Sequence, residues 1–252
     1  MEHLLTMDSL LALATLTALE IVLGIDNIVF IIILCGKLPV EQRAKARQMG
    51  LAMAMISRIA LLLTIGWVMR LTEPLFQTAF MDWNIEVSGR DLILFLGGLF
   101  LIAKATHEIY DRTEGDTAHG EPAIQAGKAG KAVFWLIVTQ IMIIDIVFSL
   151  DSVITAVGMA EHIEIMVAAI VTAVLVMMLF SGPISHFVEA HPSIKMLALA
   201  FLVLIGVMLV AESLDQHIPK GYIYFAMAFS LGVEMLNIKT HARPKPKPKP
   251  EA

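Results

Sequence analysis

The chain has 252 residues, of which 58% are hydrophobic and only 16% charged, and its mean hydropathy is +0.78. Soluble domains carry about a quarter of charged residues, so this composition excludes an ordinary soluble domain and indicates a helical protein that crosses a membrane several times. The single cysteine, Cys35, excludes a disulfide framework and a thiolate metal cluster.

Seven apolar segments follow one another along the chain, each near the ~20 residues that a helix needs to cross the hydrocarbon core. The first is too long for a signal-peptide core and is expected to be a retained span. We therefore expect an all-α membrane protein with seven transmembrane helices, at residues 9–35, 50–71, 91–109, 132–158, 163–182, 194–212 and 220–237.

Basic residues are distributed unequally between the two sides of this arrangement. The loops after the first, third and fifth spans and the C-terminal tail carry most of the Lys and Arg residues. Because cytoplasmic loops are enriched in these residues, we expect the N-terminus outside and the C-terminus in the cytoplasm. The tail, RPKPKPKPEA, alternates Lys with Pro and should be extended and solvated.

Two acidic motifs interrupt the apolar spans. EIVLGIDN, residues 20–27, lies in the first span, and DIVFSLDS, residues 145–152, lies in the fourth. A second match aligns LFLIAKATHEIYD, residues 99–111, with VLIGVMLVAESLD, residues 203–215, and places Glu108 over Glu212. Each half would contain three spans, an odd number, so the second copy should cross in the opposite direction.

These matches predict a 3+3 inverted repeat plus one extra C-terminal helix. In transporters with this plan, the binding site lies at the interface of the repeats near the bilayer midplane. We expect a first three-helix repeat at 1–109, a polar cytoplasmic loop at 110–131, a second, inverted repeat at 132–215, a seventh helix at 216–238 and a Lys/Pro cytoplasmic tail at 239–252.

Carboxylates inside a membrane span are costly, so they favour a functional interpretation. On a regular helix Glu20 and Asn27 share a face, as do Asp145, Ser149 and Ser152, whereas Asp26 lies on another face than Glu20. Asp26 would reach the site from the flank or through a helix break at Gly24. Oxygen donors favour Mg, Ca or Mn over zinc or copper, and the predicted metal ligands are Glu20, Asp26, Asn27, Asp145, Asp151 and Ser152.

A structural alternative pairs the buried acids with a basic residue inside the spans, Arg58 or Lys104. Glu212 and Glu234 lie near span ends, where a side chain can reach the membrane interface, or where it can form part of a gate. His107 is expected to face the surface. The candidate gate or charge-partner residues are Ser149, Arg58, Lys104, Glu108 and Glu212.

The motifs EIVLGIDNIVF and DIVFSLDSVITAVG, on seven spans, closely resemble the TerC family of bacterial integral membrane proteins. The last predicted span, KGYIYFAMAFSLGVEMLN, also resembles that family, and the resemblance covers about 9–237. The family is named for tellurite-resistance loci, and its members are associated with manganese export. The resemblance implies a location in the bacterial inner membrane, and the six predicted ligands match the two motifs of the family.

We therefore expect a secondary transporter, not an enzyme, that exports Mn²⁺ or another hard cation such as Ca²⁺ by alternating access. We expect no cofactor and no nucleic-acid partner. The protein would contact membrane lipids, and the sequence permits either a monomer or a homo-oligomer. The alternatives are a membrane scaffold in a stress-response complex, a small-solute exporter, and an intramembrane aspartyl protease using Asp26 and Asp151. The GxGD signature of such a protease is absent, since the local sequences are LGIDN and FSLDS.

Overall fold

The computed structural model describes residues 7–80, 83–114, 128–157, 163–216 and 218–241. In this part of the chain, seven helices are long and apolar enough to cross a membrane, which agrees with the seven predicted spans. They are α1 (Met7–Cys35), α2 (Val40–Leu63), α4 (Gly89–Thr113), α5 (Lys128–Val157), α6 (Ile163–Ala190), α7 (Pro192–Glu212) and α8 (Lys220–His241). The protein is a multi-pass, helical membrane protein.

The second span was predicted too late in the chain. Residues 50–71 were expected, whereas α2 covers Val40–Leu63 and ends at Thr64, whose hydroxyl donates to the Ala60 carbonyl at 2.7 Å. Hydropathy recognises only the apolar part of a helix, and the first turns of α2 are charged. The helix therefore begins earlier than its apolar stretch.

A small β-hairpin departs from the all-α prediction. After α3 (Ile65–Val68) and a 3₁₀ turn (Met69–Thr72), strand β1 (Pro74–Phe80) pairs antiparallel with β2 (Trp83–Ser88). Pro74 does not continue the preceding helical turns because it lacks a backbone N–H, and aromatic and β-branched residues favour the strands. Ser88 then caps α4, because its hydroxyl accepts from the Asp91 amide while the Asp91 carboxylate accepts from the Ser88 amide.

Glycines mark two close helix crossings. The helix α1 continues without a break through Gly24, so a broken helix at this position is not found. A Cβ at Gly24 would come within 2.3 Å of the Met177 sulfur of α6. A Cβ at Gly98 of α4 would come within 2.7 Å of the Gly206 carbonyl oxygen of α7. These glycines let the backbones approach, as small residues do in membrane helix packing.

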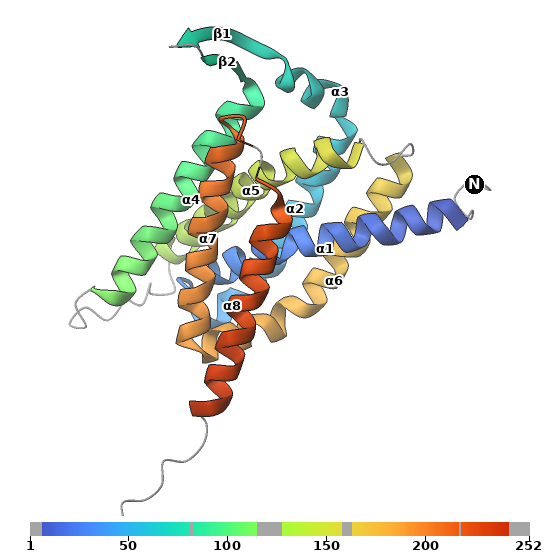
Figure 1. Ribbon diagram of the computed structural model, residues 1–252. Helices are drawn as coiled ribbons and strands as arrows, with labels where there is room; N and C mark the ends of the chain where they lie inside the picture. The colour runs from blue at the N-terminus through green and yellow to red at the C-terminus, as the bar shows by residue number, and fades with distance from the viewer. Residues whose placement is uncertain (1–6, 81–82, 115–127, 158–162, 217, 242–252) are drawn as a thin grey trace, which may run out of the picture.

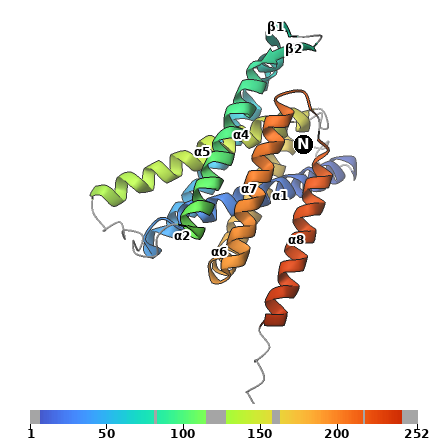
Figure 2. The same cartoon turned by 60° about the vertical axis from the view of Figure 1, so that its left-hand side comes forward.

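The most extensive helix contacts join α4 with α7, α1 with α6, and α2 with α5. Figures 1 and 2 show α4, α7 and α8 running along one direction, whereas α1 and α5 cross them steeply. The hairpin and the α7–α8 turn lie at one end of the molecule, and the last turns of α4, α6 and α8 lie toward the other (Figure 1). The interior is filled by aliphatic side chains that include Ile31, Ile32, Leu34, Ile141 and Ile144.

Candidate cation site in the membrane interior

Arg58 of α2 lies between two acidic side chains inside the helix bundle. Its Nη1 donates to Glu20 Oε2 of α1, and its Nη2 donates to Asp145 Oδ1 of α5 at 2.8 Å. Its Nε donates to both oxygens of Asp145, at 3.2 and 3.3 Å. Arg58 is only 3% exposed, Glu20 7% and Asp145 4%. Three helices therefore meet at one guanidinium, and with both acids ionised the triad has a net negative charge.

Asp145 is surrounded by further donors. Asn27 Nδ2 donates to Oδ1 at 3.0 Å, and the hydroxyls of Ser57 and Ser149 donate to Oδ2 at 3.3 and 3.1 Å. Ser149 also donates to the Asp145 carbonyl oxygen at 2.5 Å, and Ser152 donates to the Ser149 carbonyl oxygen at 3.2 Å. The spacing that places Glu20 with Asn27, and Asp145 with Ser149, on common helix faces is thus found in the structure.

Two buried oxygens near this triad have no hydrogen-bond partner among the described residues. One is the amide oxygen of Asn27, and the other is the hydroxyl of Thr17. Asn27 is only 6% exposed and its amide nitrogen is already bound to Asp145, so its oxygen stays buried at the site. Buried polar groups are almost always paired, and an exception calls for an explanation.

The predicted ligands are only partly described. Asp26 and Asp151 lie in α1 and α5, but their side chains lie outside the described residues. Among the side chains that the structure describes, no group of three His, Cys, Asp or Glu residues is close enough together to hold a metal ion. Glu20 and Asp145 are brought together through Arg58 rather than through a common ion.

Lys104, the other basic residue considered for this region, does not join the triad. It is half-buried on α4 and forms no ion pair within the described part of the chain. A small cavity of about 30 Å³ lies beside the triad instead, with Arg58, Ser152, Leu23 and Met208 among its lining residues. This volume suffices for about one water molecule.

Glu108 forms a second buried ionic cluster, at the end of α4. Its carboxylate is paired with Lys37 Nζ at 2.6 Å and with Arg112 Nη2 at 2.7 Å, and the residue is 4% exposed. Two basic side chains thus hold the buried Glu108 carboxylate. The neighbouring His107 is exposed, as predicted, and lies 3.6 Å from Asp111.

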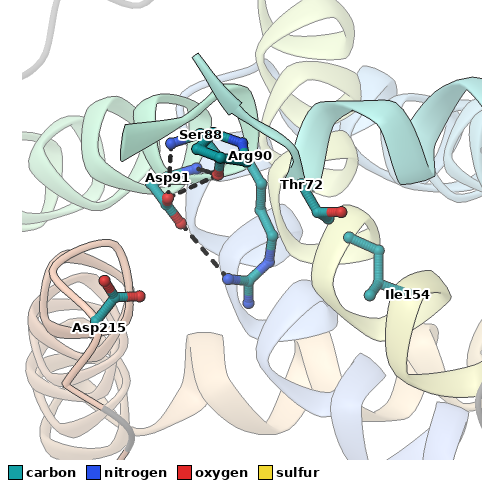
Figure 3. Close-up of a pocket in the computed structure, with 7 residues that line it drawn as sticks. Thr72, Ser88, Arg90, Asp91, Ile154 and Asp215 are labelled. Atoms are coloured by element: carbon teal, nitrogen blue, oxygen red, sulfur yellow. Dashed lines mark hydrogen bonds and ion pairs between the residues drawn. The ribbon is translucent and has the colours of Figure 1, made fainter. Parts of the chain in front are cut away.

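Glu212 occupies the opposite end of the α4–α7 pair. Its carboxylate accepts from Arg90 Nη2 at 3.1 Å. Arg90 also lies 3.6 Å from Asp91, and both line a polar cavity of about 290 Å³ beneath the hairpin (Figure 3). Ile154 of α5 and Asp215 line other parts of the same cavity (Figure 3).

Sequence reasoning missed five residues of these clusters, of which Arg112, like Lys37 and Arg90, was counted only as a loop charge. Ser57 lies in an apolar run with no motif around it, whereas Thr17 precedes Glu20 by three residues on the same helix face, a spacing that could have identified it. Lys37 and Arg90 were counted only as loop charges, although each forms an ion pair with a glutamate that the internal repeat had singled out. The matching of Glu108 with Glu212 was the available signal, because two equivalent acids suggest two equivalent bases.

The chain is similar to known integral membrane proteins. The family model described as "Integral membrane protein TerC family" matches residues 5–247. A UPF0053 protein of Haemophilus influenzae is 55% identical over 92% of this chain and 94% of its own length. The UPF0053 inner membrane protein YgdQ of Escherichia coli is 57% identical over 90% of this chain and 92% of its own length.

A longer Escherichia coli protein, UPF0053 inner membrane protein YoaE, is 51% identical over 94% of this chain but only 44% of its own length. No solved structure matches the chain significantly.

Proposed function

Because the chain belongs to the TerC family of integral membrane proteins, we propose that it is a secondary transporter exporting a divalent cation, foremost Mn²⁺, from the cytoplasm. Two relatives in Escherichia coli are named inner membrane proteins, and we place this chain in the inner membrane of a bacterium as well. The proposal concerns transport and not catalysis, and the cation is the cargo.

The observation that carries the proposal is the meeting of Glu20 and Asp145 in the membrane interior, next to the amide oxygen of Asn27, which has no partner among the described side chains. Carboxylate and amide oxygens are the donors that Mn²⁺ and Ca²⁺ prefer. A buried amide oxygen without a partner is costly in a protein that only needs packing. A cation that binds this oxygen during part of the transport cycle would explain why it is kept.

Helix packing supports the inverted repeat that alternating access would use. In the proposed repeat, α1, α2 and α4 correspond to α5, α6 and α7. Replacing each helix by its counterpart turns the α1–α6 contact into the α5–α2 contact and turns the α4–α7 contact into itself. These are the three most extensive helix contacts. We propose that the halves rock against each other around the Glu20–Asp145 region.

The two ionic clusters support the proposed orientation. Lys37 and Glu108 lie at the end that carries most loop Lys and Arg residues, which we assign to the cytoplasm. Arg90 and Glu212 lie at the hairpin end, beside the polar cavity that Figure 3 shows. We assign this cavity to the release side, because Ile154 on its wall follows Ser152 by two residues on α5.

The test is Mn²⁺ flux through the purified protein in sealed liposomes with a metal-sensitive dye. We expect Asp145→Asn to reduce the flux at least about tenfold, because it removes a charged donor from the site. Asp26→Asn and Asp151→Asn test the ligands assigned from the sequence motifs. Glu164→Gln is the matched control, because this acid is exposed in the first turn of α6.

The outcomes separate the alternatives. If Asp145→Asn transports Mn²⁺ as fast as the parent protein, the site assignment is wrong. If the parent moves amino acids or other small solutes but no divalent cation, the small-solute exporter replaces the cation exporter. A parent protein that moves none of these would leave the membrane scaffold and the intramembrane protease, and cleavage of a reporter span would separate these two.

A further inference from the structure

We propose that Arg58 acts as a resident counter-cation, which the transported cation must displace from Glu20 and Asp145 before it can bind. The inference rests on the proposed transport function and adds a competitor within the same site. It starts from the observation that the guanidinium uses oxygens of both acids.

The oxygens that a cation needs are occupied by donors. Asp145 Oδ1 accepts from Asn27 and from two nitrogens of Arg58, while Oδ2 accepts from Arg58, Ser57 and Ser149. A divalent cation binds carboxylate oxygens at about 2.0–2.6 Å, inside the space that these donors fill. The guanidinium and the cation therefore cannot use Asp145 at the same time.

Charge leads to the same exclusion. An arginine side chain does not lose its proton in proteins, so Arg58 can leave the acids only by moving. In a low-dielectric interior, a divalent cation held by the same carboxylates would repel the guanidinium strongly. Without either cation, the ionised acids would be buried unpaired, which is costly. One of the two cations should therefore occupy the acids at every stage of the cycle.

The surroundings of Arg58 restrict where it can go. The adjoining cavity of about 30 Å³ holds about one water molecule, which is too little for a guanidinium. Ser152 of α5 and Met208 and Leu209 of α7 line this cavity. Arg58 can enter it only if these helices separate, so exchange of the guanidinium for the transported cation would be coupled to a helix movement.

The helix that corresponds to α2 in the second half of the chain carries no counterpart of Arg58. Helix α6, the counterpart of α2 in the proposed repeat, contains neither Lys nor Arg. Within the described residues, Arg58 is the basic side chain that contacts both Glu20 and Asp145. A single substitution at this position therefore removes the competitor from both acids.

The experiment measures Mn²⁺ binding and Mn²⁺ flux on the same purified proteins. Binding is followed by loss of the free Mn²⁺ signal in electron paramagnetic resonance, and flux by the liposome assay. We expect Arg58→Gln to bind Mn²⁺ at least about tenfold more tightly and to transport it at least about tenfold more slowly, because nothing then displaces the cation.

Arg47→Gln is the matched control. Arg47 is another buried arginine of α2, but its Nε donates to Ser181 Oγ of α6 and not to either acid. The affinity of the Arg47→Gln variant for Mn²⁺ should stay within about twofold of that of the parent protein. Arg58→Lys keeps a cation at the site and should transport faster than Arg58→Gln.

Loss of folding is tested with a second pair of variants. Glu20→Gln and the double variant Glu20→Gln/Arg58→Gln differ only at position 58, and the double variant retains the net charge of the native triad. The double variant should bind Mn²⁺ at least about tenfold more tightly than Glu20→Gln.

Two outcomes are kept apart by this design. If the parent transports Mn²⁺ but removal of Arg58 leaves the affinity unchanged or weaker in both backgrounds, Arg58 is only a structural ion-pair partner and the inference is overturned. If neither the parent nor any Arg58 variant binds or transports Mn²⁺, the proposed function fails and the inference fails with it.

Discussion

At the scale of single residues, the polar groups of α1 form a line that the apolar sequence conceals. Thr17, Glu20, Gly24 and Asn27 are spaced by three, four and three residues, so they lie on one helix face. Glu20 contacts Arg58, whereas the oxygens of Thr17 and Asn27 have no partner among the described residues. On this face, an acid therefore lies between two buried oxygens that have no partner in the described part of the chain, and the proposed transport would use these oxygens as cation ligands.

Thr17 allows a test of this interpretation. The hydroxyls of Thr64, Thr113 and Thr172 donate to carbonyls one turn earlier in their own helices, whereas the buried hydroxyl of Thr17 has no partner in the described part of the chain. Thr17→Val should therefore leave the free energy of unfolding unchanged or raise it by about 1 kcal/mol, because the substitution removes an unsatisfied polar group. If the hydroxyl serves the cation, Mn²⁺ flux should fall severalfold.

Thr172→Val is the control for this measurement, because Thr172 is exposed on α6 and its hydroxyl is paired with Ala168. A clear loss of stability in Thr17→Val would show that the hydroxyl is needed for packing. Unchanged flux would remove Thr17 from the path.

At the scale of helices, two crossings depend on glycine, and they differ in what faces the missing side chain. Gly98 faces the backbone oxygen of Gly206, which cannot move without shifting α7. Gly24 faces the end of Met177, whose flexible side chain can rotate away. The α4–α7 contact should therefore be the less tolerant of the two.

Alanine substitutions test this difference. Gly98→Ala should lower the free energy of unfolding by about 1–3 kcal/mol through overpacking, and Gly24→Ala should cost less. Gly66→Ala is the control, because a Cβ at this exposed residue would meet no other side chain or distant backbone atom within 4 Å. Thermal unfolding in detergent measures all three. Equal unfolding temperatures for Gly98→Ala and Gly66→Ala would contradict the close α4–α7 approach.

At the scale of the whole molecule, two ion pairs lie at opposite ends of the α4–α7 pair. Lys37–Glu108 joins the region after α1 to the last turns of α4, and Arg90–Glu212 joins the start of α4 to the end of α7. In the proposed cycle, the first pair would open when the protein faces the cytoplasm and the second when it faces outward. Breaking the Lys37–Glu108 pair should therefore favour the conformation that faces the cytoplasm, and breaking the Arg90–Glu212 pair should favour the one that faces outward.

Accessibility from each side tests these ion pairs. In a Cys35→Ala background, Leu23→Cys beside the small cavity reports access to the site. Glu212→Gln should raise the labelling rate of Leu23→Cys from outside severalfold, because a partly buried ion pair is worth about 1 kcal/mol. Glu108→Gln, which loses the ion pairs with Lys37 and Arg112, should raise the rate from the cytoplasmic side. If both variants raise the labelling rate from the same side, the two ion pairs do not control access from opposite sides.

The orientation itself is tested by cysteine labelling of intact cells with a membrane-impermeant maleimide. Leu75 of β1 and Thr113, the last residue of α4, are exposed, and the native Cys35 is only 2% exposed. The strand β1 and the end of α4 lie at opposite ends of the molecule (Figure 1). Leu75→Cys should be labelled in intact cells, whereas Thr113→Cys should be labelled at least about tenfold less until the cells are opened. The reverse pattern would place the N-terminus in the cytoplasm.

Much of the fold follows from composition and local pattern. The number of membrane helices is set by the length of apolar runs, because a helix is the simplest way to satisfy backbone groups in hydrocarbon. The hairpin at Pro74–Ser88 and the early start of α2 were missed, because both lie where hydropathy carries no signal. Helical spacing also placed Glu20 with Asn27, and Asp145 with Ser149, on shared faces.

Tertiary structure alone decided what those faces meet. The sequence by itself determined that acids lie inside two spans, and it named Arg58 and Lys104 as equal candidates for pairing with them. Packing of α2 against α5 brings Arg58 to Asp145 and Glu20, whereas Lys104 on α4 stays apart. Charge pairing across helices depends on helix crossing and rotation, which are set by side-chain packing such as that at Gly24 and Gly98 and have no local signature in the sequence.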